Sequence, residues 1–454
     1  MSSVLLVYPF FRRSLDRSRF RFPPLGPAYV AAALRAAGHQ VRLLDCTFLS
    51  RERALRLALA ARADVVGVYA MATMRADAVW FADRLRGRCG LLVAGGPLPT
   101  CEPASFLGPF DAVVLGEAET AMTGLVAAHD AGGDLGAVRG VLTHHGAPGA
   151  PAGPVSPAVS AGPAGLDALP SPARDLLPNA AYIRHNRRRL GFAVTTVMST
   201  RGCPYACEFC SNTVHGRAYR EHSPARVVDE IEQALALGYD RIAFADDVFT
   251  LRREHVLGVC AEIERRGLRF DWECLGRVDG LDAAVAATMR RAGCRTVFFG
   301  LESGSDDVLR RMRKQTTAAQ ARAAVGAAHD AGLEVGGFFI LCYPGETDET
   351  VLETLRFIDS LPLDYVGLSM PYPLPGTALR ERMTGRMRRE SRPDGSLLLN
   401  QQLTFESDFS ARKMRLAILS GRARFELRRR LGRYGPAAAR MAAAPADALF
   451  RRLS

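Results

Sequence analysis

The sequence lacks the features of a membrane or secreted protein. It has no apolar run of 18 or more residues and no leader in which positive charges precede an apolar stretch. A membrane-spanning helix needs about 20 apolar residues, so we expect a soluble, cytoplasmic protein with no membrane partner. The ten cysteines lie mostly in apolar or ordinary sequence and do not outline a disulfide framework. Such cysteines are typical of reduced intracellular proteins, so we expect no disulfides.

The chain also lacks a strong charge imbalance outside its C-terminal tail. The formal net charge is +12, but residues 411–454 hold 12 Lys or Arg and two acids, so the first 410 residues carry only +2. A basic tail can contact nucleic acid or an anionic membrane. The interpretation we favour is a solvated face on Arg-rich helices, without a nucleic-acid partner. With 454 residues, 48% of them hydrophobic, the chain is long enough for two or three globular domains.

Residues 1–140 alternate short apolar runs with helix-like stretches, which predicts an α/β fold with a doubly wound, Rossmann-like parallel sheet. Ligands of such sheets bind at the carboxyl ends of the strands. The expected strands are 4–8, 41–45, 65–69, 91–94 and 112–115. The loops that follow four of them, and are therefore candidates for ligand contact, are 8–10, 69–73, 95–100 and 116–120.

Three further segments follow. Residues 141–184 are rich in Pro, Gly and Ala and are interpreted as a linker, and residues 386–454 as a small, basic helical segment. Between them, residues 185–385 show a second strand–helix alternation of six units, which predicts a partial (β/α)6 TIM-type barrel with its site at the carboxyl ends of the strands. Its expected strands lie near 192–198, 240–245, 270–275, 296–301, 334–341 and 365–370.

The most informative feature is the spacing C-x₃-C-x₂-C of Cys203, Cys207 and Cys210, on a loop after a β-prone run. Four thiolates would close every iron of a [4Fe–4S] cluster, whereas three leave one iron open to a ligand that is not protein. A structural zinc site is the alternative, because His215 or His222 is close enough in sequence to supply a fourth ligand.

The segment 198–210 resembles the signature of the radical SAM enzymes, whose S-adenosylmethionine chelates the open iron. Further elements of that family follow the barrel strands in the same order, among them Pro373–Thr377, which resembles the element of the sixth strand. The family usually has Gly where this chain has Cys342. The resemblance implies that S-adenosylmethionine is bound by Asp246, Asp247, Arg277, Glu302, Ser303 and Gly337.

Three of these polar residues, Asp246, Asp247 and Arg277, also have an ordinary structural interpretation. Asp246 and Asp247 suit the methionyl amine, but a helix cap is equally open. Arg277 offers a planar fork for the carboxylate of S-adenosylmethionine, or for a salt bridge inside the barrel. Glu302 can accept from the ribose hydroxyls, and Ser303 is small enough to allow close approach.

Residues 1–175 resemble the cobalamin-binding domain that a large radical SAM subclass carries. The matching segments are 23–26, 95–100, 115–119 and 166–175. The resemblance implies cobalamin contacts by Thr73, Gly95, Gly96, Gly116 and Glu117. A D-x-H-x-x-G motif is absent, and Leu98 stands where the subclass frequently has His, so a histidine bound to cobalt from below is not expected.

The resemblance implies reductive cleavage of S-adenosylmethionine to a 5′-deoxyadenosyl radical, with electrons from an external flavodoxin- or ferredoxin-type donor. The leading hypothesis is cobalamin-dependent C-methylation of a small molecule, namely a specialised metabolite such as an antibiotic precursor. The alternative is dehydration of a diol-containing sugar or aminoglycoside, with the N-terminal domain as a scaffold. There Tyr219, with His215 and Glu221, is a candidate catalytic donor of protons or hydrogen atoms, or simply packs after the cysteine loop. A tRNA methylthiotransferase is disfavoured, because the tail has no alternating strands of an RNA-binding barrel.

Overall fold

A computed structural model describes residues 1–11, 20–144, 165–388, 405–431 and 435–453. The described residues form two compact units. The first contains those of Met1–Pro204 and Ser211–Ile242, and the second those of Tyr205–Cys210, Ala243–Glu390 and Leu399–Ser454.

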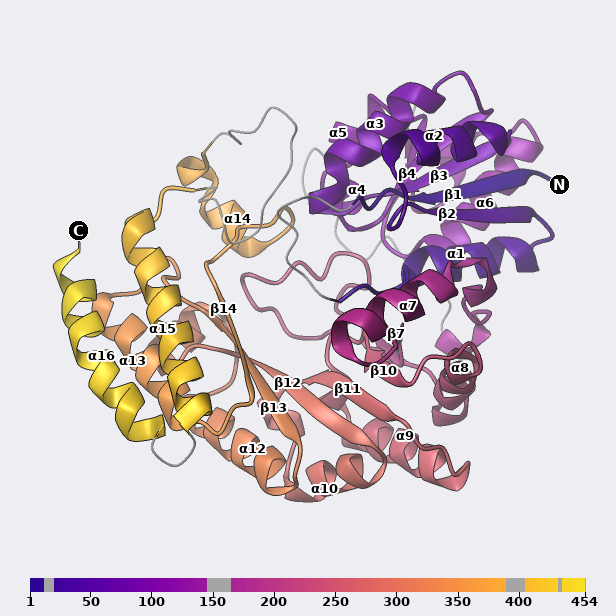
Figure 1. Cartoon of the computed structure of the whole chain (residues 1–454). Helices are drawn as coiled ribbons and strands as arrows, with labels where there is room; N and C mark the ends of the chain where they lie inside the picture. Colours follow the sequence, from indigo (N-terminus) through magenta and orange to yellow (C-terminus); the bar gives the residue numbers. More distant parts are fainter. Residues whose placement is uncertain (12–19, 145–164, 389–404, 432–434, 454) are drawn as a thin grey trace. The chain divides into compact units, whose positions relative to one another are not determined.

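The first unit is built on a six-stranded sheet with the order β2-β1-β3-β4-β5-β6 (Figure 1). The pairings of β1 to β5 are parallel, and β6 is antiparallel to β5. The elements of this α/β layer are β1 (Ser3–Tyr8), α1 (Leu25–Ala36), β2 (Gln40–Asp45), α2 (Arg51–Ala60), β3 (Val65–Tyr69), η1 (Ala72–Met74), α3 (Arg75–Leu85), β4 (Leu91–Gly95), α4 (Pro97–Cys101), α5 (Ala104–Leu107), β5 (Ala112–Val114), α6 (Ala118–Asp130), η2 (Leu135–Ala137) and β6 (Val141–Thr143).

Both faces of this sheet are covered by helices. Successive strand side chains point to opposite faces, so Leu5 and Val7 join one core while Val4 and Leu6 join another. Buried residues of α2 and α3 belong to the first core, and buried residues of α1 and α6 to the second. Two apolar faces that are each covered by helices confirm the doubly wound architecture.

The first unit continues beyond the sheet with a helix, short strands and a further helix. The helix α8 begins after Ser223, whose hydroxyl accepts a hydrogen bond from the backbone N–H of Arg226 and so satisfies a free donor of the first turn. The elements are η4 (Leu166–Ala168), η5 (Arg174–Leu176), α7 (Asn179–Leu190), β7 (Val194–Val197), β8 (Thr200–Arg201), β9 (Arg220–Glu221) and α8 (Pro224–Ala236). The residues interpreted as a linker, 141–184, therefore include β6, two 3₁₀ turns and the start of α7.

The second sheet has the order β14-β13-β12-β11-β10-β7, and β11 to β14 pair in parallel. The register shifts between Gly300 and Glu302, at the carboxyl end of β12. The elements after β9 and α8 are β10 (Arg241–Phe244), η6 (Phe249–Leu251), α9 (Arg253–Arg265), β11 (Asp271–Gly276), η7 (Val278–Gly280), α10 (Ala283–Arg291), β12 (Cys294–Glu302), α11 (Asp306–Arg311), α12 (Ala318–Asp330), β13 (Glu334–Ile340), α13 (Asp348–Ser360), β14 (Tyr365–Ser369), α14 (Ala378–Arg382) and η8 (Thr384–Arg386). Six strands that alternate with helices confirm the partial barrel class.

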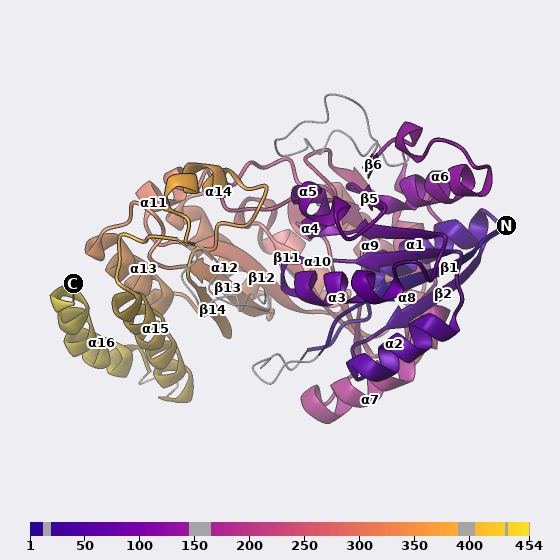
Figure 2. The same cartoon turned by 90° about the horizontal axis from the view of Figure 1, so that it is seen from above.

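Two C-terminal helices, α15 (Ala411–Leu431) and α16 (Gly435–Arg452), lie side by side in both views of the chain (Figures 1 and 2). The helix α15 packs so closely on β14 and α13 that a Cβ atom on Gly421 would lie 2.6 Å from Leu368 Cδ1. Two of its arginines make structural contacts within the second unit. Arg424 is 2% exposed and pairs with Asp447, and Arg428 donates to the carbonyl of Leu363 at 3.0 Å. Within the part of the chain that the structure describes, no helix is both long and apolar enough to cross a membrane.

Candidate functional site

The cysteine loop leaves the first unit through a small hairpin. The strands β8 and β9 pair antiparallel, with Arg201 opposite Arg220, and the loop with the three cysteines runs between them. Gly202 has φ of 85°, and a Cβ atom there would lie 2.2 Å from the carbonyl oxygen of Ala218. The N–H of Cys203 donates to the carbonyl of Gly216 at 3.1 Å. Cys203 is therefore fixed at the base of the loop, where the backbone lies so close together that only glycine fits at position 202.

None of the ten cysteines forms a disulfide, and the three of the motif are among the five that are not buried, together with Cys89 and Cys101. Cys210 is exposed, and Cys203 and Cys207 are partly exposed. Burial raises the pKa of the Cys260 thiol to about 12, and five cysteines in all are fully buried. Burial also raises the pKa of Cys89 to about 11 and raises that of Cys101. Buried neutral thiols are poor metal ligands, so the accessible thiols of the motif suit iron better than the five buried ones.

The three cysteines of the loop belong to two different units. Cys203 lies in the first unit, and Cys207 and Cys210 in the second. Among the described residues, no group of three or more His, Cys, Asp or Glu side chains is close enough to hold a metal ion. The two imidazoles of the zinc alternative have other contacts. His215 Nδ1 lies 3.5 Å from a Glu117 oxygen, and His222 Nδ1 lies 3.0 Å from Asp167 Oδ1.

Glu208, which no sequence motif singles out, anchors the second half of the loop within the second unit. Its carboxylate accepts from the Tyr343 hydroxyl at 2.7 Å and from Arg382 Nε at 2.6 Å. Its backbone N–H donates to Met312, and its carbonyl accepts from Leu379. Glu208 is 5% exposed and stands between Cys207 and Cys210, so these contacts fix both cysteines on the barrel.

Arg277, at the end of β11, lies beside the same loop. Its guanidinium carbon is 3.4 Å from the ring centroid of Tyr205, and its Nε and Nη2 donate to Asp279 at 3.0 and 2.9 Å. Burial opposes the charge of Arg277, but the hydrogen bonds and charge of Asp279 raise its pKa. The guanidinium is thus held ionised against a residue of the cysteine loop, at the strand end where the sequence predicts it.

Two strand ends of the second sheet carry residues in the left-handed region. Glu302 and Cys342 both have φ of 62°. The Glu302 carboxylate lies 3.1 Å from Lys314 Nζ, and both side chains are about nine-tenths buried. A side chain other than glycine costs about 1–2 kcal/mol in this conformation. The usual Gly of the family at the position of Cys342 therefore matches the backbone that the structure shows there.

The other predicted contacts of S-adenosylmethionine have mixed environments. The Ser303 hydroxyl is fully buried and lies 2.8 Å from Thr354 Oγ1, on α13. A Cβ atom on Gly337 would lie 2.9 Å from Phe339 Cε2, so this glycine is needed for packing. Asp246 is buried and Asp247 exposed, just after β10.

The predicted cobalamin contacts share the carboxyl edge of the first sheet. The N–H of Gly116 donates to Thr100 Oγ1 at 3.0 Å, and that hydroxyl donates to the carbonyl of Gly96 at 2.9 Å. The carbonyl of Gly95 accepts from Ala70 at 2.8 Å, and Thr73 lies in η1, shortly after β3. The loops after β3, β4 and β5 are therefore joined to one another.

Glu117 behaves differently from its neighbours, because its side chain turns to the cysteine hairpin. Its oxygens contact Arg201 Nη1 at 2.8 Å and Arg220. Burial alone would raise the pKa of Glu117, but hydrogen bonds from His215 and Arg220 and the charge of Arg201 lower it to about 2. Tyr219, on the same hairpin, donates to Glu221 Oε2 at 3.1 Å.

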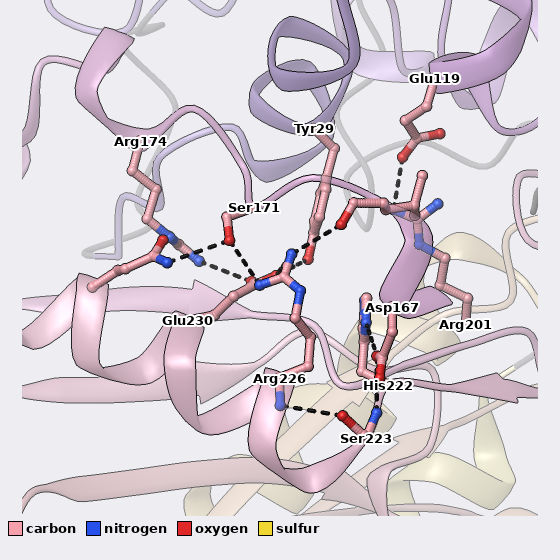
Figure 3. Close-up of polar contacts among 12 residues, drawn as sticks. Tyr29, Glu119, Asp167, Ser171, Arg174, Arg201, His222, Ser223, Arg226 and Glu230 are labelled. Carbon is pink, nitrogen blue, oxygen red and sulfur yellow. Dashed lines mark hydrogen bonds and ion pairs between the residues drawn. The ribbon is translucent and has the colours of Figure 1, made fainter. Parts of the chain in front are cut away.

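A second buried cluster of the first unit is centred on Glu230 (Figure 3). Glu230 of α8 accepts from the Tyr29 hydroxyl at 2.8 Å and lies 3.2 Å from Arg226 and 3.8 Å from Arg174. Burial raises the pKa of Glu230 despite these cations. The cluster ties α8 to α1 within the first unit and uses no residue of the cysteine loop.

Comparison with known proteins agrees with both halves of this arrangement. Residues 197–358 match the model of the radical SAM superfamily, and residues 15–126 match that of the B12-binding domain. An uncharacterized methyltransferase of Pyrococcus horikoshii is 33% identical over 388 residues, which cover 83% of this chain and 82% of the relative.

Two solved structures share the fold. The radical S-adenosylmethionine methyltransferase TsrM of Kitasatospora setae, with cobalamin and a [4Fe–4S] cluster bound, has a TM-score of 0.70 at 21% identity, over 84% of this chain and 74% of that one. The cobalamin-dependent radical enzyme OxsB, with aqua-cobalamin and S-adenosylmethionine bound, has a TM-score of 0.77 at 15% identity, over 99% and 72%. Together with the family matches, the extent and identity of the Pyrococcus relative show that this chain belongs to the radical SAM superfamily, as an enzyme whose domains serve a [4Fe–4S] cluster with S-adenosylmethionine and cobalamin.

Proposed function

We propose that this protein is a cobalamin-dependent radical SAM methyltransferase that acts on a small molecule. The observation that carries the proposal is the presence of a B12-binding domain and a radical SAM domain in one chain. A relative named as a methyltransferase covers most of the chain, and TsrM, a methyltransferase, shares its fold.

In this proposal Cys203, Cys207 and Cys210 hold the cluster. The chemistry of the donor set fits, because three thiols that are at least partly exposed leave one iron for S-adenosylmethionine. The cluster supplies the electron that cleaves the sulfonium, and an external donor of the flavodoxin or ferredoxin type must reduce it. The task of the chain is to hold the reactants in line and to exclude water and stray hydrogen donors.

The strand ends of the barrel are proposed to bind S-adenosylmethionine. Arg277 presents a charged fork to its carboxylate, and Glu302, with Asp246 and Asp247, accepts from its amine or hydroxyls. Ser303 and Gly337 support this surface through the backbone, since the Ser303 hydroxyl is already bonded to Thr354.

The edge formed by Thr73, Gly95, Gly96 and Gly116 is proposed to face cobalamin. Gly96 and Gly116 have φ of 106° and 68°, a backbone conformation that favours glycine, and neither places a side chain at this edge. Cobalamin supplies the methyl group that is transferred. Thr73 supplies a hydroxyl at the same edge.

The test is anaerobic reconstitution with iron, sulfide and hydroxocobalamin, desalting, and incubation with S-adenosylmethionine and a reductant. The wild type is expected to retain cobalamin and to release both S-adenosylhomocysteine and 5′-deoxyadenosine. Cys203→Ala, Cys207→Ala and Cys210→Ala should each abolish 5′-deoxyadenosine, because a cluster with two protein ligands is not held. The matched control, Cys89→Ala, removes a partly buried thiol outside the motif and should behave as the wild type.

Two results would contradict the proposal in different ways. Cleavage of S-adenosylmethionine without retained cobalamin, and with 5′-deoxyadenosine as the only nucleoside product, would favour the dehydration that uses the N-terminal domain as a scaffold. Cleavage that survives any of the three alanine substitutions would remove that cysteine from the cluster.

A further inference from the structure

Two acidic side chains at the turn between β5 and α6 form ion pairs at the base of the cysteine loop. Arg201 of β8 donates from Nη1 to Glu117 at 2.8 Å and from Nη2 to Glu119 at 2.7 Å. Arg201 and Glu117 are each 2% exposed at their side chains, and Glu119 is 8% exposed. Figure 3 shows the contact of Glu119 with Arg201 beside the ring of Tyr29, which lies 5.0 Å from the guanidinium.

The second strand of the hairpin is held by the same turn. Arg220, which is paired with Arg201 across the hairpin, also contacts Glu117. Two carboxylates thus face two guanidinium groups, and their charges balance in a site where Arg201, Glu117 and Glu119 are buried and Arg220 is partly exposed. Ion pairs at this depth are expensive to break, because removal of one partner leaves an uncompensated buried charge.

This network lies two residues from the first cysteine. The backbone between Arg201 and Cys203 has little freedom, because there is no room for a Cβ atom on Gly202 beside the carbonyl of Ala218 and the N–H of Cys203 is bonded to the carbonyl of Gly216. A displacement of Arg201 is therefore transmitted directly to the Cys203 thiol.

We propose that Glu117 and Glu119 are positioning residues for Cys203. They hold the β8–β9 hairpin, so the N-terminal α/β unit contributes to cluster retention whether or not cobalamin is bound. Glu117 then acts through the cysteine loop, and its side chain is not a cobalamin contact. The proposal rests on the proposed function only in that the three cysteines bind a [4Fe–4S] cluster.

The experiment compares Glu117→Gln and Glu119→Gln with the wild type, all reconstituted with iron and sulfide in the absence of cobalamin. Iron and sulfide per chain are measured after desalting, followed by the rate of iron loss to a chelator and the thermal midpoint. The matched control is Glu230→Gln, which removes an equally buried carboxylate of the same unit from the Tyr29–Arg174 cluster. Both turn variants should lose iron roughly ten- to a hundredfold faster than the wild type, the usual cost of a lost residue behind a metal ligand. The Glu230→Gln variant should lose iron at the wild-type rate even where its thermal midpoint falls.

The outcomes separate the two proposals. A wild type that takes up no cluster refutes the proposed function. A wild type that holds the cluster, with turn variants that lose iron at the wild-type rate, refutes the positioning role. Equally fast loss from Glu230→Gln also refutes that role, because it would reflect a general loosening of the unit. Glu119 is the less buried of the two acids, so Glu119→Gln keeps the test available if Glu117→Gln does not fold.

Discussion

The contacts of Glu208 lead to a quantitative prediction about the second unit. The substitution Glu208→Gln keeps the shape of the side chain but removes the charge that Arg382 and Tyr343 bind. A hydrogen bond to a charged group contributes about 1.5–3 kcal/mol. The Arg382 side chain is 44% exposed and can be rehydrated, which reduces its share, whereas Tyr343 is fully buried. We therefore expect a loss of about 2 kcal/mol in the free energy of unfolding for Glu208→Gln.

The two tryptophans of the chain allow each unit to be observed separately. Trp80 lies in α3, and Trp272 is fully buried in β11. In a Trp80→Phe background, tryptophan fluorescence reports only the second unit. A loss of about 2 kcal/mol should lower its thermal midpoint by roughly 4–8 °C in a unit of this size. The matched control is Glu349→Gln, since Glu349 pairs with Arg451 at the surface and should change stability by less than about 1 kcal/mol.

A double-substitution cycle tests the physical reasoning. Arg382→Met alone leaves the Glu208 carboxylate buried and only partly compensated, so it should also destabilise the unit. Because the two residues share one interaction, the double variant should be less destabilised than the sum of the single variants. Additive losses, or equal shifts for Glu208→Gln and Glu349→Gln, would refute the interpretation of Glu208 as an anchor of the cysteine loop.

Two further predictions concern packing and pH. Gly421→Ala should destabilise the second unit by about 1–3 kcal/mol, because the new methyl group would lie 2.6 Å from Leu368 Cδ1. Gly326 lies in α12, and a Cβ atom added there would have no neighbour within 4 Å, so Gly326→Ala should instead stabilise the unit by about 0.5–1 kcal/mol. If urea unfolding ranks the two variants in the opposite order, it contradicts the packing argument. Burial lowers the pKa of His222 from 6.5 to about 4, so its contribution to stability is complete above pH 6.5 and is lost as the pH falls. Burial raises the pKa of Glu346 from 4.5 to about 7, so its contribution is complete below pH 4.5 and is lost as the pH rises. Between pH 4.5 and 6.5, His222→Gln should therefore make the slope of unfolding free energy against pH more negative and Glu346→Gln more positive, and a change of the same sign in both would contradict these assignments.

The regular elements could be predicted because their residues repeat a simple pattern. The run Val65–Tyr69 is apolar and β-branched, and it forms a buried strand with the predicted bounds. The strand Val141–Thr143 was not predicted. It has three residues, lies next to a stretch rich in Pro and Gly, and is defined by its pairing with Ala112–Val114. A short edge strand of this kind depends on a tertiary partner, so local sequence carries little information about it.

The same distinction applies to the candidate site. The three cysteines could be read from their spacing, and Arg277 from its place at a strand end. Glu208 could not be predicted, because its partner Arg382 is 174 residues away and a residue between two cysteines of a motif has no signature of its own. Glu117 was identified as a residue of interest, but its contacts with Arg201, 84 residues away, depend on the hairpin and have no signature in the sequence.

The turn that carries Glu117 takes part in both proposals about the cofactors. Gly116 has φ of 68°, and its N–H is bonded toward the loop after β4, at the edge proposed for cobalamin. The next side chain leaves in another direction and enters the ion network with Arg201. Backbone and side chain thus have separate partners, Thr100 for the Gly116 N–H and Arg201 for the Glu117 carboxylate. The positioning role proposed for Glu117 and Glu119 therefore predicts that both are needed to retain the cluster whether or not cobalamin is bound.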